Sequence, residues 1–187
     1  MIQVRVVLGA VIIGALVAGS LSAGPVLTLS PASNLTGAPA ATVGWGFTLT
    51  NAVNWIEVVQ AQFCLDSPVK NPCFTPSLQF FDIISNPPQD VIVGPGGSTS
   101  QPYNPGSNQG LGSFTIDPGA PNGSTVSGNI LLTYNTFDND PNQGGNQIGF
   151  NDAISTPATV TAVPEPASAT FMGLAGAALL LSRLRRR

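Results

Sequence analysis

The sequence contains no histidine, which removes much of the side-chain chemistry that enzymes use near neutral pH. Without an imidazole, neither a Ser-His-Asp nor a Cys-His arrangement can form, and most zinc chemistry is excluded as well. A hydrolase with paired carboxylates needs only acidic residues. Here, however, Glu57 and Glu165 are the only glutamates. We therefore expect that the protein is not an enzyme, and we keep a carboxylate-dependent hydrolase as an alternative.

Basic residues are scarce and unevenly placed. The chain has six Lys and Arg residues in total. Four of them form an arginine cluster at the carboxyl end: Arg183, Arg185, Arg186 and Arg187. Between residues 23 and 162 the single basic residue is Lys70, against eight carboxylates, so this region has a net charge of about −7. Because phosphate contacts need Lys and Arg, we exclude nucleic acid as a partner, and an anionic membrane surface for the same reason.

Residues 1–22 have the order of a secretory signal peptide. Arg5 supplies a positive n-region, residues 6–18 form a short apolar run, and small residues follow. Small side chains stand at the positions that signal peptidase reads, which predicts export by the Sec machinery and cleavage after Ser22, with cleavage after Ala23 as a close alternative. A permanent membrane helix is the other interpretation, but the run is shorter than the roughly 20 residues of a typical span.

The carboxyl-terminal residues 163–187 combine three features in order. The tripeptide Pro164-Glu165-Pro166 cannot continue a helix, residues 167–182 carry no charge, and the arginine cluster closes the chain. As a helix the uncharged segment would extend for about 24 Å, less than the roughly 30 Å of a bilayer core. It is a marginal transmembrane helix that flanking arginines must help to complete. By the positive-inside rule the arginines stay cytoplasmic, so the preceding domain lies outside.

This arrangement resembles the PEP-CTERM sorting signal of exported bacterial proteins, over the last 25 residues or so. The resemblance implies that an exosortase, an integral membrane enzyme, recognises Pro164, Glu165 and Pro166, cuts near them and removes the helix. It also implies a Gram-negative host that usually makes exopolysaccharide, a transient membrane tether, and a final location at the cell surface or outside the cell. A permanent tail anchor is the alternative.

Cys64 and Cys73 are the only cysteines and lie in the segment FCLDSPVKNPCF. In an exported protein a lone pair this close together is typical of one disulfide that closes a turn. A metal site is the alternative interpretation, but zinc would need further Cys or His ligands. We therefore predict a disulfide between Cys64 and Cys73.

Residues 23–162 suffice for one domain, and alternation of apolar and polar residues dominates them. Turn signals such as Asn-Pro-Pro and Asp-Pro-Gly separate the alternating segments. Strands are predicted within residues 26–29, 42–51, 55–63, 80–84, 90–93, 111–118, 122–135 and 158–163. Loops are expected within 24–39 and 94–110. Such short strands favour an all-β fold, an antiparallel β-sandwich of immunoglobulin-like type, with a signal helix and a transmembrane helix only at the two ends. A jelly roll is the alternative.

A Gly-rich segment, residues 138–152, concentrates oxygen donors of the kind that Ca²⁺ prefers. Asp138, Asp140 and Asn142 match the first three ligand positions of an EF-hand loop. The match then fails, because Gln143 replaces the turn glycine and the bidentate glutamate is missing. A weak Ca²⁺ site is therefore one hypothesis, and a solvated loop between the last two strands is the other. No further cofactor is expected.

Two classes of function remain for the central domain. The first is a non-enzymatic structural or adhesive role in the biofilm, linked to exopolysaccharide. The second is a carbohydrate-binding module that uses Trp45, Trp55 or Tyr103 as a stacking platform, although the two tryptophans are interpreted first as packing residues.

Overall fold

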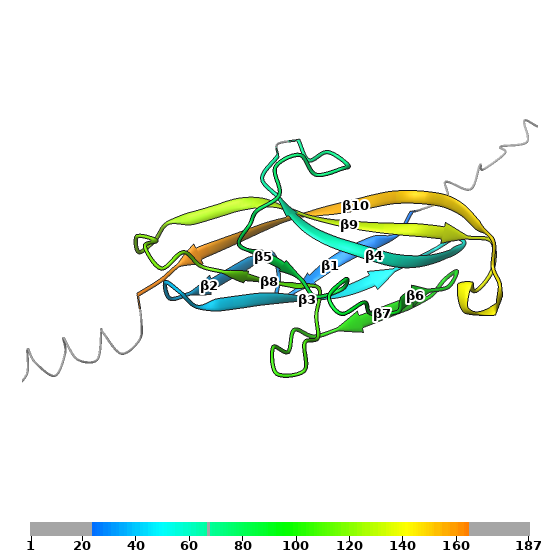
Figure 1. Cartoon of the computed structure of the whole chain (residues 1–187), viewed down its shortest axis with the longest axis horizontal. Coiled ribbons are helices and arrows are strands. Elements are labelled where there is room, and N and C mark those ends of the chain that lie inside the picture. Colours follow the sequence, from blue (N-terminus) through cyan, green and yellow to red (C-terminus); the bar gives the residue numbers. More distant parts are fainter. Residues whose placement is uncertain (1–23, 67, 165–187) are drawn as a thin grey trace, which may run out of the picture.

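The structure is a computed structural model, and it describes residues 24–66 and 68–164 (Figure 1). The expected signal peptide, Glu165, Pro166, the expected transmembrane helix and the arginine cluster lie outside the described residues. Across the two described ranges there is no helix of the length and hydropathy that crossing a bilayer requires.

The first sheet has five strands, four of which follow the order β1-β3-β8-β5. Strand β3 pairs with β1 along one edge, while β8 and β7 share its other edge. The bounds are β1 Val26–Ser30, β3 Thr42–Thr50, β5 Phe80–Asp82, β7 Ser98–Gln101 and β8 Gly112–Thr115.

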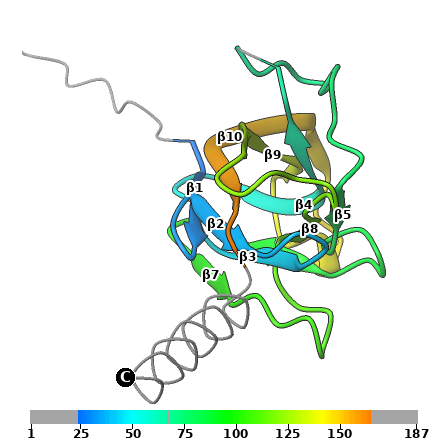
Figure 2. The ribbon, with the colours of Figure 1, turned by 90° about the vertical axis from the view of Figure 1, so that its left-hand side faces the viewer.

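The second sheet has five strands in the order β2-β10-β9-β4-β6. The two longest strands, β9 and β10, form its centre, and a short 3-10 helix, η1 Pro141–Gln143, lies in the connection between them. The bounds are β2 Asn34–Gly37, β4 Trp55–Cys64, β6 Val91–Val93, β9 Thr125–Phe137 and β10 Gln147–Ala162. The turned view in Figure 2 shows the two sheets as layers, with β9 and β10 on one side and β3 and β7 on the other.

The core lies between the two sheets and follows from the period-two pattern of β3 and β9. Trp45, Phe47 and Leu49 of β3 are almost completely buried, as are Ile130 and Leu132 of β9. Since successive side chains of a strand point to opposite faces, this alternation directs one face of each strand inward. The all-β, two-sheet architecture expected from the sequence is therefore confirmed.

One strand pair departs from the expected antiparallel arrangement. Strand β2 pairs in parallel with β10, whereas the other named strand pairs are antiparallel. The reason is that β1 and β2 belong to different sheets, so the chain changes sheet at residues 31–33 and continues beside β10 in the same direction.

The two stretches expected to be loops are partly strands. Residues 24–39 contain β1, which the alternating pattern also predicted, and β2; residues 94–110 contain β7. Strands β2 and β7 are short, polar edge segments whose strand conformation comes from pairing with β10 and β3. A side-chain pattern contains little information about such segments.

The last strand is much longer than its predicted bounds of 158–163. Strand β10 begins at Gln147, within a region that looks like loop because of its Gly, Asn and Asp residues. Two register irregularities near Gly149 accommodate these residues without ending the pairing with β9. β-Bulges of this kind allow turn-forming residues inside a strand.

Candidate functional site

The junction between the domain and the expected sorting signal is held by backbone hydrogen bonds up to its last residues. Ala162 ends β10, and its amide donates to the Ser124 carbonyl at 2.9 Å. The Val163 amide then donates to the Gly37 carbonyl, also at 2.9 Å. Pro164, which follows at once, is exposed. The paired structure therefore extends to the residue before the tripeptide.

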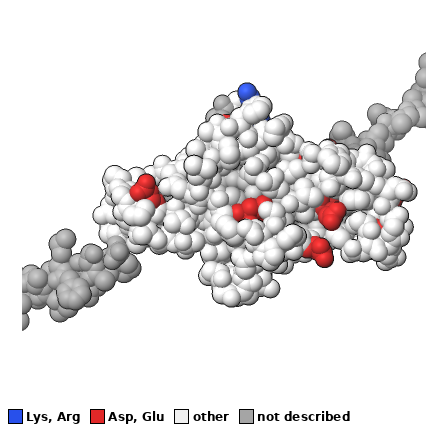
Figure 3. Space-filling model, viewed as in Figure 1, with Lys and Arg blue, Asp and Glu red and all other residues white. Residues whose placement is uncertain are grey.

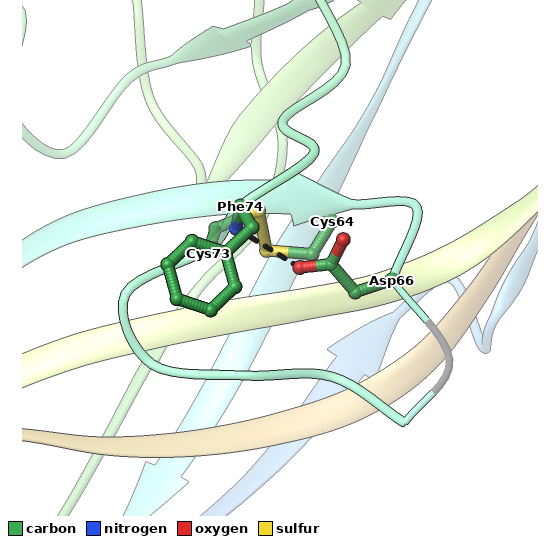
Figure 4. The surroundings of a disulfide bond; sticks show 4 residues. All are labelled: Cys64, Asp66, Cys73 and Phe74. Carbon is green, nitrogen blue, oxygen red and sulfur yellow. Dashed lines mark hydrogen bonds between the residues drawn. A yellow bond between two sulfur atoms is a disulfide. The ribbon is translucent and has the colours of Figure 1, made fainter.

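The predicted disulfide is present between Cys64 and Cys73, with Cα atoms 5.8 Å apart (Figure 4). Cys64 is the last residue of β4, and the connection to β5 projects from the sandwich at this point (Figure 1). The Phe74 amide donates to the Asp66 carboxylate at 2.9 Å, beside the bridge. Hydrogen bonds from Thr75 and Phe74 hold the pKa of Asp66 below its usual range. The bridge and these bonds fix the base of the projecting loop.

The projecting loop, residues 65–66 and 68–79 between β4 and β5, presents apolar side chains to solvent. Phe74 is 66% exposed and Leu78 is 100% exposed. The Lys70 ammonium lies 5.4 Å from the centre of the Phe74 ring, within cation-π range. Figure 3 shows basic atoms only at the tip of this projection in the view drawn, while acidic residues are scattered over the body. Loop and body thus differ in charge, because the one described lysine lies in the loop and most of the carboxylates lie on the body.

The loop between β9 and β10 carries the residues of the calcium hypothesis. The Asp138 carboxylate accepts from the Asn146 main-chain amide at 2.7 Å and from its side-chain amide at 3.1 Å. The Asp140 carboxylate accepts from the Asn142 amide at 2.9 Å and from the Gln143 side chain at 3.3 Å. Asn146 thereby holds the pKa of Asp138 below its usual range. Both carboxylates are engaged with their own loop.

No group of three or more His, Cys, Asp or Glu residues that could hold a metal ion occurs within the described ranges. Asn142 contributes to the loop through its main-chain amide, which donates to the Asp140 carboxylate, and not through its side chain. The carboxylates of Asp138 and Asp140 accept hydrogen bonds from main-chain amides and so close the turn of their own loop. This is the usual role of Asp in turns.

Of the three candidate stacking aromatics, Trp45 is excluded by its position. Its side chain is 0% exposed and stacks on Phe63 inside the core, so it cannot contact a sugar. Trp55 is half-buried and packs against Gly94, where a Cβ atom would come within 3.1 Å of the indole ring. The Tyr103 ring covers the backbone of Gly44 in a similar way. The structure therefore assigns Trp45 to packing, while Trp55 and Tyr103 each contact a glycine and remain half-exposed.

No protein-family model and no curated protein matches the chain. The functional interpretation therefore depends on the residues themselves.

Two open cavities are candidate ligand sites that the sequence did not indicate. The larger, of about 470 Å³, lies by β6 and β7 and is lined mainly by amide and hydroxyl side chains, with Asp90 as its one charged residue. The smaller, of about 290 Å³, lies where the described chain begins and includes Asp152. Their lining residues come from segments far apart in the sequence, so no local motif could reveal them.

Proposed function

We propose that the chain is an exported bacterial protein that an exosortase sorts through residues 163–187. The observation that carries this proposal is the order of the tripeptide, the uncharged segment and the arginine cluster at the carboxyl end. A Pro-Glu-Pro tripeptide is common by chance, but one placed between a folded domain and such a segment is not. The precursor would be tethered to the inner membrane of a Gram-negative host and, after cleavage, would reside at the cell surface or outside the cell.

The junction described above supports this order of events. Backbone pairing of the domain includes Ala162 and Val163, and exposed Pro164 follows directly. A protease that cuts near Pro164 would therefore remove the helix without breaking a strand pair. Exposed chain beside a fixed strand end is also what a protease needs for access.

We further propose a non-enzymatic structural or adhesive role, with exopolysaccharide as a partner in the matrix. The projecting loop supports adhesion, because Phe74 and Leu78 are large apolar side chains held in solvent on a loop closed by a disulfide. Apolar side chains exposed on one loop can contribute to a contact surface when they form a continuous patch. A catalytic role has no comparable support, given a sequence without histidine.

The strand order supports the immunoglobulin-like assignment within this proposal. The order β1-β3-β8-β5 corresponds to strands A-B-E-D of that fold, and β10-β9-β4 corresponds to G-F-C. Strand β6 lies beside β4 in the position of C′, but it follows β5 in the chain, whereas C′ precedes D in the immunoglobulin fold, so the correspondence covers the other strands and not β6. Modules of this architecture commonly serve in cell-surface contacts, although fold alone does not establish a role.

The deciding experiment is mass spectrometry of the mature protein from cells with and without exosortase. We expect a carboxyl terminus near Pro164 in the first case and Arg187 in the second. A Glu165→Gln variant should accumulate as the uncut form, while a matched Asp90→Asn variant, altered only in the domain, should be cut as usual. Retention of Arg187 in both strains would overturn the proposal.

A further inference from the structure

The larger cavity lies at the edge of the sandwich where β6 and β7 come together. Strand β6 is the last strand of the second sheet, and β7 pairs with β3 in the first sheet. The two strands lie side by side, and contacts between them join the two sheets at this edge (Figure 1). Both strands contribute to the lining of the cavity, which has a volume of about 470 Å³. The cavity therefore lies between the two sheets at one edge of the domain.

Strand register decides which side chains of β7 point toward this space. Gln101 lies directly opposite Phe47 of β3, whose side chain is buried in the core. Thr99 lies in the same way opposite the buried Leu49. Because directly opposed residues of an antiparallel pair point to the same face, the side chains of Thr99 and Gln101 project from the inner face of β7. Both residues line the cavity, so β7 presents polar side chains to it.

The connections before β6 and after β7 complete the lining and are bonded to each other. The Gln89 side-chain amide donates to the Ile83 carbonyl at 3.1 Å and to the Asn108 carbonyl at 3.0 Å. The Asn108 side-chain amide donates in turn to the Asn86 carbonyl at 3.0 Å. Gln89 and Asn108 both line the cavity. The walls are therefore fixed before a ligand arrives, which lowers the ordering cost of binding.

The side chains in the lining indicate the class of ligand. Small-molecule sites of about 300–1,000 Å³ are usually lined mainly by apolar residues. Here amide and hydroxyl side chains predominate, and each of these can both donate and accept hydrogen bonds. A matching ligand has many groups that also donate and accept, as the hydroxyl groups of a sugar do. Pro87 and Val91 add apolar contacts for the C–H groups of such a ring.

The charge of the lining narrows this class. Asp90 is its one charged residue, and none of the described residues in the lining is basic. A carboxylate can accept hydrogen bonds from sugar hydroxyl groups. A uronate or a phosphorylated sugar would instead bring a second negative charge, with no Lys or Arg in the lining to balance it, and such like-charge contacts are costly. The cavity therefore favours neutral sugars over acidic ones.

We infer that the cavity between β6 and β7 is a binding site for neutral sugar units of a polysaccharide. Thr99 and Gln101 supply hydrogen bonds from one side, and Asp90 disfavours acidic sugars. The inference rests on the matrix role proposed above, and it adds the place where the glycan binds and the class of sugar that is selected. It does not depend on aromatic stacking, because the recognition comes from hydrogen bonds within the cavity.

The test is a titration of the full exported chain, labelled with ¹⁵N and followed by NMR, in detergent where residues 167–182 are retained. The probes are the neutral trisaccharides maltotriose, cellotriose and mannotriose, and the acidic trigalacturonate. We expect at least one neutral trisaccharide to shift the amide signals of Thr99, Gln101 and Asn108 in a saturable way. Trigalacturonate at the same concentrations should leave these signals in place.

Two variants remove hydrogen-bonding groups and keep the approximate size of the side chain. Thr99→Val and Gln101→Leu should each weaken binding of the responding trisaccharide about three- to tenfold, the range expected for the loss of one hydrogen bond. The matched control is Thr136→Val at the smaller cavity, which should keep the wild-type affinity. The spectrum of each variant shows whether it is folded. If one variant does not fold, the other variant and the wild-type map of shifted signals decide.

The outcomes separate this inference from the sorting proposal. No saturable shift with any of the three neutral trisaccharides would overturn the inference, and so would shifts confined to other parts of the domain. An equal response to trigalacturonate, or unchanged affinity in both folded variants, would overturn it as well. None of these results affects sorting, which is decided by the carboxyl terminus of the mature protein. Conversely, retention of Arg187 in both strains would overturn sorting and would not alter the titration.

Discussion

Trp45 and Phe63 come from different sheets, and their rings stack in the core with centroids 5.9 Å apart and planes 22° apart. Phe114 also contacts Phe63, with ring centroids 5.4 Å apart in an edge-on arrangement. These aromatic side chains join the two sheets within a larger core of aliphatic residues. A sandwich of this size depends on such cross-sheet packing because neither sheet can bury its apolar face alone.

Replacement of Trp45 by alanine should destabilise the fold strongly. The change removes the largest fully buried side chain and leaves a cavity between the sheets, at a cost of about 3–5 kcal/mol. Urea unfolding followed by circular dichroism measures the loss. Phe150→Ala, at a side chain that is 72% exposed, is the control and should change stability by less than about 0.5 kcal/mol. Equal effects at both positions would contradict the assignment of Trp45 to the core.

The disulfide should stabilise the domain through the loop that it closes. Cys64 and Cys73 are separated by nine positions, and cross-linking a loop of this size is worth about 2–3 kcal/mol. We expect the Cys64→Ala/Cys73→Ala double variant to lose that amount in urea unfolding. Reductant should lower the stability of the wild type similarly and leave the double variant unchanged. Two reactive thiols in the untreated native protein would contradict the bridge.

Acid should weaken the connection between β9 and β10 by protonating Asp138. Asn146 lowers the pKa of this carboxyl in the folded state, first through its side chain and then through its main-chain amide. The corresponding stabilisation is present above the unfolded pKa of about 3.9 and is lost as the pH falls through the folded value. Thermal melts of wild type and Asp138→Asn should therefore differ at pH 7 and converge near pH 2. Asn146→Ala should remove part of the same pH dependence, and a constant difference would exclude this mechanism.

Removal of divalent cations should leave the domain unchanged. The carboxylates of Asp138 and Asp140 already accept hydrogen bonds from their own loop, so the turn is closed without an ion. Thermal melts with a chelator and with millimolar Ca²⁺ should have the same midpoint. A midpoint that rises with Ca²⁺ in the wild type and not in Asp140→Asn would instead support the calcium hypothesis.

Much of the fold could be predicted from side-chain periodicity. Strand β3 was recognisable because Trp45, Phe47 and Leu49 alternate with small or polar residues, and burial of that face is confirmed. The edge strands β2 and β7 could not be recognised from the sequence. A polar segment adopts strand conformation only when a partner supplies its hydrogen bonds. The parallel pairing of β2 with β10 was missed for the same reason.

Among the candidate sites, too, some could be predicted from the sequence and others could not. The disulfide was predictable because both cysteines lie in one short segment, and the tripeptide is likewise a local feature. The cavity with Asn51 and Asp152 was not predictable, since Asn51 follows β3 in the first sheet and Asp152 lies on β10 in the second, and only the packing of the two sheets brings them to one cavity. Excluding Trp45 as a sugar-stacking residue also required knowing which face of β3 is buried in the core.

By itself, the sequence determined the all-β character of the domain, its net negative charge, its cysteine pair, and the order of features at the two ends of the chain. Each of these is a matter of composition or of neighbours along the chain, which folding does not alter. Only the tertiary structure decided that the aromatics form a cross-sheet core, that a loop with Phe74 and Leu78 projects from it, and that Gly24 lies at a cavity with Asp152. These relationships depend on residues distant in sequence, and they arise from strand pairing and from the packing of the two sheets, which leave no local signature.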